Sequence, residues 1–110
     1  MRLVILETPY APTEHGTVED HLLYARICLA DCLKRGEAPI ASHLLYTQPN
    51  VLDDTIPEER ALGIAAGHEW FRVAEACVVY TDFGISTGMQ HGIATAVAEG
   101  VPVEYREYER

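Results

Sequence analysis

The 110-residue chain is poor in basic residues: 8 Lys and Arg oppose 17 Asp and Glu, a formal net charge of −9. This deficit disfavours a large nucleic-acid or anionic-membrane surface, because both partners are themselves negatively charged. We therefore expect no polymeric nucleic acid and no membrane among the partners of the protein. A small nucleoside or nucleotide, held by backbone dipoles, remains compatible with this charge.

The chain also lacks the roughly 18 to 20 consecutive apolar residues of a membrane span and the leader pattern of a secreted protein. Both absences predict a cytoplasmic location. The three cysteines are odd in number, and Cys28 and Cys32 lie one helical turn apart within an apolar face. We interpret them as buried thiols, with a redox or metal role as the alternative, and expect no metal and no cofactor.

Strand-like and helix-like segments alternate along the chain. Short apolar runs at 2–6, 38–42, 77–80 and 101–105 are typical of strands, and the first three are each followed by helical spacing. The first helix is predicted to follow the N-cap Thr17 and to end at Gly36. The second is predicted to follow the cap Thr55, with Pro57 in its first turn, and to run to about residue 74; the third spans about 87–99.

This alternation predicts a parallel sheet with helices on both faces and right-handed crossovers. We expect residues 1–110 to form one α/β domain, a three-layer Rossmann-like or flavodoxin-like fold with four to five mostly parallel strands. Ligands of such folds bind beyond the carboxyl ends of the strands. The loops at 7–12, 43–54 and 82–89 are all predicted to lie at that edge.

The most informative segment is Thr-Asp-Phe-Gly-Ile-Ser-Thr-Gly-Met at 81–89, which joins a predicted strand to a predicted helix. A helix N-terminus presents unpaired N–H groups and the positive end of the helix dipole, so it binds phosphate or another anion without a cationic side chain. We expect the ligand at this turn. The substrate-binding residues predicted there are Gly84, Ser86, Thr87, Gly88, Met89 and Gln90.

With these elements in order, nearly the whole chain resembles the nucleoside 2-deoxyribosyltransferase-like superfamily, especially its small phage and bacterial members. The motifs that carry the resemblance are Pro9-Tyr10, Gly36-x-x-Pro39, Ser-His-Leu-Leu-Tyr at 42–46, Asp82-x-Gly84-x-Ser86-x-Gly88-Met89 and Gly-Val-Pro-Val at 100–103. In the related deoxynucleoside 5′-monophosphate N-hydrolases a Ser-x-Gly turn binds the 5′-phosphate. The resemblance therefore implies this role for Ser86 and Gly88.

The resemblance also implies cleavage of an N-glycosidic bond by a glutamate nucleophile on the third helix. Its position here is Gly92, or Gln90 in the alternative transferase-type spacing, and neither residue supplies a carboxylate. Three options stay open: a binding protein on an enzyme scaffold, an enzyme with a relocated acid, or a different reaction.

Asp82, Glu7 and the pair at 53–54 are candidates for a relocated acid. The resemblance implies that Asp82 contacts sugar or base, although the same residue could simply cap its turn. Glu7 ends a buried strand, where a carboxylate is unfavourable unless it is used or paired, with Arg60 or Arg72 as possible partners. We take Asp82 and Glu7 as the candidate catalytic residues.

Tyr10 and His43 complete the predicted substrate site. Tyr10 is expected to shape a base pocket, and His43 to move a proton near neutral pH or to hydrogen-bond the backbone. Trp70 and Phe71 on the second helix fit a partner subunit or a packed core face equally well; the resemblance implies homo-oligomers, and we therefore predict a homodimer.

The leading hypothesis is a nucleoside- or nucleotide-binding protein similar to N-glycosidic transferases and hydrolases. The alternatives are a non-catalytic nucleotide sensor or sequestering protein, such as a phage might encode, and a partner-binding domain without a small ligand.

Overall fold

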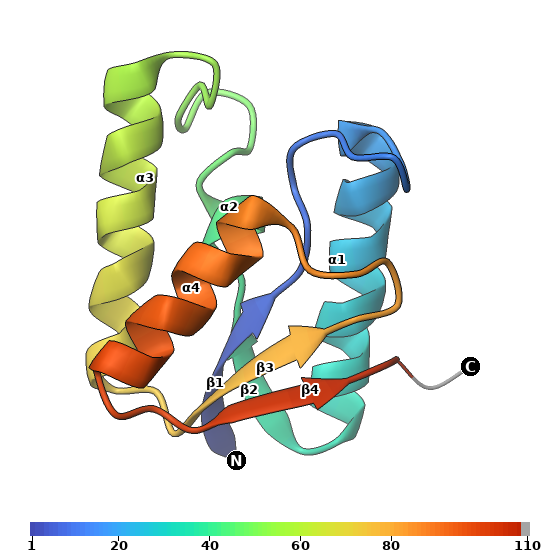
Figure 1. The fold of residues 1–110 in the computed structure, drawn as a ribbon, viewed down its shortest axis with the longest axis vertical. Coiled ribbons are helices and arrows are strands. Elements are labelled where there is room, and N and C mark those ends of the chain that lie inside the picture. Colours follow the sequence, from blue (N-terminus) through green and yellow to red (C-terminus); the bar gives the residue numbers. More distant parts are fainter. Residues whose placement is uncertain (109–110) are drawn as a thin grey trace.

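The computed structural model describes residues 1–108, which alternate between strands and helices as predicted (Figure 1). In chain order the elements are β1 (Arg2–Glu7), α1 (Val18–Lys34), β2 (Glu37–Ile40), α2 (Ser42–Leu45), α3 (Pro57–Glu69), the 3₁₀ helix η1 (Trp70–Arg72), β3 (Ala76–Tyr80), α4 (Thr87–Ala98) and β4 (Val103–Arg106).

The four strands form one all-parallel sheet in the order β2-β1-β3-β4, which confirms the predicted α/β class. Helix α1 covers one face, and α3 and α4 cover the other, so the domain has three layers (Figure 1). Residues 1–108 contain no fifth strand. None of the helices in this range combines the length and apolar character that a membrane crossing requires.

Side chains of the central strands alternate between two cores. Val4 and Leu6 of β1 pack toward α1, whereas Ile5 packs toward η1 and α4. This period of two follows from the strand pleat, and both faces are apolar because helices cover both. Cys28 and Cys32 lie in the α1-side core as buried free thiols, as their spacing predicted.

The helix ends follow local capping chemistry. Thr17 is the N-cap of α1 and Gly36 follows its end with φ 81°, both as predicted; the structure adds Asp20, which completes a capping box with Thr17. The predicted cap Thr55 is wrong: Ile56 is the N-cap of α3, and the Thr55 hydroxyl donates to Asp53 at 2.6 Å. Because Asp53 and Thr55 form an Asx-type turn, the Thr55 hydroxyl is not available to accept a hydrogen bond from the first turn of α3.

Other boundaries also differ from the prediction. Ser42, expected at the end of the second strand, and residues 43–45, expected within a loop, form the short helix α2, and the second long helix gives way to η1 after Glu69 instead of running to residue 74. Gly67 lets α3 approach α2 closely, because a β-carbon at this position would lie 2.8 Å from Cβ of Ser42. This contact fixes α2 beside the carboxyl edge of the sheet.

A partly buried ion network joins three strands on the α1 side. Glu37 of β2 accepts hydrogen bonds from Arg2 of β1 at 2.6 Å and from Arg106 of β4 at 2.8 and 2.9 Å. These two guanidinium groups, Arg106 foremost, hold the pKa of Glu37 at about 2 despite its burial. Glu104 also accepts from both arginines, so each buried charge in this group has partners.

Candidate functional site

The turn between β3 and α4 presents open backbone N–H groups. Gly84 adopts φ 78°, and Ser86 caps α4 by accepting from the N–H of Met89 at 3.3 Å. The N–H groups of Thr87 and Gly88 have no acceptor among residues 1–108. A helix start of this kind attracts anions through these groups and through the helix dipole.

Asp82, which lies in this turn, forms hydrogen bonds with α1 and with the segment after β4. The hydroxyl of Tyr24 on α1 donates to its Oδ1 at 2.5 Å, and the backbone N–H of Tyr108 donates to the same oxygen at 3.3 Å. The Tyr24 hydroxyl also accepts from the N–H of Asp82 at 3.1 Å. These hydrogen bonds give Asp82 a structural role different from the expected turn cap: its side chain is turned toward α1 and links the turn to α1 and to the segment after β4.

Glu7, the other candidate acid, is turned toward α4 on the opposite face. Its half-buried carboxylate has no hydrogen bond or ion pair within the described part of the chain, and desolvation raises its pKa to about 8. The suggested pairing with Arg72 is wrong, because that guanidinium binds Glu69 at 3.0 Å in the next turn of the same segment. The two candidate catalytic residues are therefore not brought together.

The carboxylate of Glu7 lies directly against Gly92 of α4. A β-carbon built on Gly92 would be 2.7 Å from Oε1 of Glu7 and would overlap Oε2. A side chain at position 92 and the present Glu7 rotamer exclude each other. The position at which the family resemblance expects a carboxylate thus has no side chain of its own and faces one from β1.

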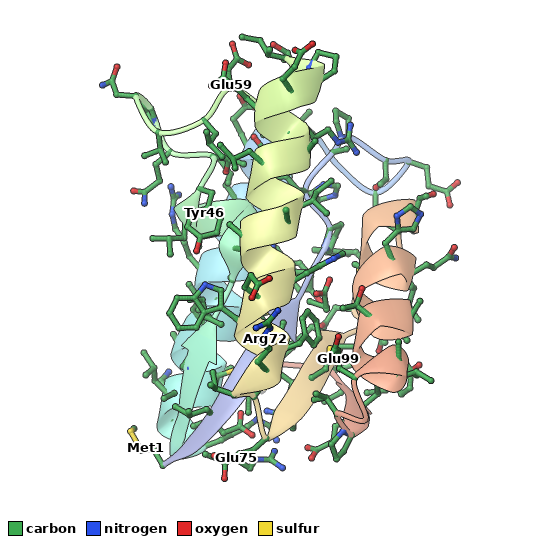
Figure 2. The ribbon with its side chains drawn as sticks, turned by 90° about the vertical axis from the view of Figure 1, so that its left-hand side faces the viewer. Met1, Tyr46, Glu59, Arg72, Glu75 and Glu99 are labelled. Carbon is green, nitrogen blue, oxygen red and sulfur yellow. The ribbon has the colours of Figure 1, made fainter. Side chains whose placement is uncertain are left out.

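Two adjoining hollows of about 80 and 460 Å³ open at the same carboxyl edge, between the loop after β1 and the loop before α3. Tyr10 lines both, and His43 lines the smaller, so the structure brings these two predicted residues together. Tyr46 and Glu59 also line the smaller hollow, and Figure 2 shows Tyr46 beside α3 and Glu59 in the first turn of α3, both on the side away from α4. The predicted turn residues 84–90 do not line either hollow.

His43 is tied to the end of β1 by a short hydrogen bond. Its Nε2 lies 2.6 Å from the hydroxyl of the buried Thr8, and desolvation lowers the pKa of the imidazole to about 4. The ring is therefore neutral at pH 7, which argues against the titration near neutrality expected from the sequence. Thr8 itself was missed, because its burial depends on a partner that lies 35 positions away.

Sequence reasoning also missed part of the wall of the smaller hollow: Tyr46, Thr47 and Arg60. The indole N–H of Trp70 donates to the Tyr46 hydroxyl at 2.9 Å and so links the loop to η1. The signals in the sequence for this region were the motif at 42–46 and the length of the loop around 43–54.

A protein-family model matches residues 2–106, nearly the whole domain with all four strands. The chain belongs to the family described as Domain of unknown function (DUF7768). No curated protein matches the chain. Three features of this DUF7768 protein lie at the carboxyl edge of the sheet and could bind or act on a ligand: Glu7, His43 and the open N–H groups at the start of α4.

Proposed function

We propose that this DUF7768 protein binds a nucleoside or a nucleoside 5′-monophosphate at the carboxyl edge of its sheet, for chemistry at the N-glycosidic bond. The observation that carries the proposal is the pair of open N–H groups of Thr87 and Gly88, at the same edge as the hollow lined by Tyr10 and His43. The N–H groups suit a phosphate, and the phenol and imidazole suit a base or sugar.

The phosphate part of this proposal is tested by placing a charge over the open N–H groups. A β-carbon at Gly88 finds only Ser86 Oγ, at 4.0 Å, so side chains fit there. Gly88→Asp adds a negative charge, and Gly88→Asn is its neutral match in shape. We expect the Asp variant to bind 2′-deoxynucleoside 5′-monophosphates at least about tenfold more weakly than the Asn variant in calorimetry, because like charges repel at contact distance.

The parent nucleosides serve as the control ligands, since without a phosphate they should bind both variants equally. Equal affinity of the two variants for a bound monophosphate would contradict the assigned phosphate position. Absence of binding of every nucleoside and monophosphate to the wild-type protein would overturn the proposed function as a whole and would favour the partner-binding alternative.

A second candidate is a nucleotide sensor or sequestering protein without catalysis. The engagement of Asp82 by Tyr24 and the missing side chain at Gly92 favour it. Chromatographic detection of free base separates the two functions, because a sensor binds the same nucleotides with no release.

We also propose a homodimer that uses the outer face of α3 and η1. Leu62, Trp70 and Val73 are exposed there, whereas Phe71 is buried in the core. Exposed apolar side chains gathered on one face favour association. Sedimentation of the wild type and of Leu62→Glu tests this: a monomeric wild-type protein would contradict it.

A further inference from the structure

Glu7 and Gly92 share one small volume between the sheet and α4. Strand β1 is an interior strand, and Glu7 pairs in register with Val79 of β3. From there its side chain reaches the buried backbone of Gly92, where a β-carbon would overlap the carboxylate. The carboxylate therefore fills the place that any side chain at position 92 would occupy.

The two most deeply buried carboxylates of the described chain, Asp31 and Glu37, are both paired with arginines. Glu37 is held by Arg2 and Arg106, and these partners lower its pKa to about 2. Glu7 has no such partner in residues 1–108, and burial moves its pKa in the opposite direction. A structural role of the kind seen for Glu37 therefore does not account for Glu7.

Gly92, which lies within α4 against Glu7, is a second residue that is unfavourable for the stability of the fold. Glycine within a helix lowers its stability relative to alanine, yet glycine is the residue that leaves room for the carboxylate. A partly buried, unpaired acid and a helix glycine that accommodates it both lower stability. Residues that lower the stability of the fold, together with a titratable group whose pKa is shifted, are typical of functional sites.

Resting on the nucleotide binding proposed above, we propose that Glu7 is the catalytic carboxyl group of this protein, a general acid that protonates the base leaving an N-glycosidic bond. Its place at the end of β1 is beside the loop that carries Tyr10 and beneath the first turns of α4. A ligand held by the start of α4 and by Tyr10 would span this position.

The reaction is a hydrolysis in which Glu7 is regenerated. The bond between C1′ and the base nitrogen breaks, its electron pair stays on the nitrogen, and the Glu7 proton joins that nitrogen. A water oxygen bonds to C1′, and the proton lost by this water returns to the Glu7 carboxylate. Nucleotide and water thus give free base and sugar phosphate, and burial keeps Glu7 protonated near neutral pH, as a general acid requires.

Glu7→Gln tests the role directly, because the amide keeps the shape and has no proton of suitable acidity. With 2′-deoxynucleoside 5′-monophosphates as probes, we expect calorimetric affinity within about threefold of wild type and base release slower by about 100-fold or more. Wild-type release should fall as the pH rises above about 8. The exposed substitution Glu99→Gln is the control and should change neither quantity.

A second variant tests the shared volume. Glu7→Ala/Gly92→Glu moves the carboxylate from β1 to α4, and we expect it to release base at least about tenfold faster than Glu7→Ala alone. Equal rates for these two variants, or full release by Glu7→Gln, would overturn the inference. Wild-type protein that binds a monophosphate without releasing base would overturn the catalytic role and leave the binding proposal standing, whereas absent binding would overturn both.

Discussion

Replacing Glu7 with glutamine is expected to make the protein more stable at neutral pH. Desolvation raises the pKa of Glu7 from 4.5 to about 8, so the folded state retains the proton between these values while the unfolded chain releases it. The folded state then binds more protons than the unfolded state, and this carboxyl group lowers stability as the pH rises from 4.5 to 8. Glutamine is neutral throughout and removes that dependence.

The size of the effect follows from the shift. Each pKa unit corresponds to about 1.36 kcal/mol, so the interval from pH 4.5 to pH 7 corresponds to about 3 kcal/mol in the free energy of unfolding. The Glu7 charge also acts on Cys77 of β3, but burial first and this charge second raise the pKa of that thiol to about 12, so it stays neutral in this range. The difference between variant and wild type should therefore reflect Glu7.

Urea unfolding followed through Trp70, the one tryptophan in the sequence, provides the assay. With a slope of about 1.5 kcal/mol/M, a gain of about 3 kcal/mol moves the midpoint of the glutamine variant up by about 2 M at pH 7. At pH 4 the two midpoints should coincide. Glu99→Gln at the exposed end of α4 should change stability by less than about 0.5 kcal/mol at either pH.

A stability difference between Glu7→Gln and wild type that is the same at pH 4 and pH 8 would refute the reasoning. It would mean that the Glu7 carboxylate is solvated or paired in the folded state and titrates as it does in the unfolded chain.

Three further substitutions test other parts of the structure. Glu37→Gln should lower the free energy of unfolding by about 3 kcal/mol at pH 7, given a folded pKa of about 2 against 4.5; in urea titrations this deficit should vanish as the pH falls from 4.5 to 2 and the wild-type carboxylate takes up its proton. Gly67→Ala should lower the melting temperature by roughly 5 to 10 °C because its methyl group overlaps Ser42, and Gly67→Ala/Ser42→Gly should regain most of the loss. Tyr24→Phe should destabilise the protein by about 2 kcal/mol in urea, since it removes a hydroxyl that donates to the Asp82 carboxylate; wild-type stability would contradict that contact.

The layered fold could be predicted because its signals are local. Apolar periodicity marked each strand and long helix, and the Thr17 cap and Gly36 fixed the ends of α1. The errors arose where two local rules competed. Thr55 has a good capping side chain, but Asp53 two residues earlier offers its hydroxyl an acceptor, so the helix starts without that cap.

The candidate site could be predicted only in part. Topology was enough to bring Tyr10 and His43 to one hollow, because both follow carboxyl ends of adjacent strands. The roles of the two acids depend on partners that are remote in sequence: Tyr24 for Asp82, and Gly92 for Glu7. Such pairings are decided by packing between layers, which periodicity and spacing do not specify.

The ion network on the α1 side also bears on how the chain folds. Arg2 meets Glu104 across 102 positions, and Arg106 meets Glu37 across 69. Until β4 has left the ribosome, Arg2 and Glu37 lack partners on that strand, and the sheet remains open at the β3 edge. Contacts of this sequence separation slow folding, and an exposed edge invites pairing with other chains. Until β4 pairs with β3, a newly made chain therefore presents an unpaired edge at β3, a strand that is buried along its whole length in the folded protein.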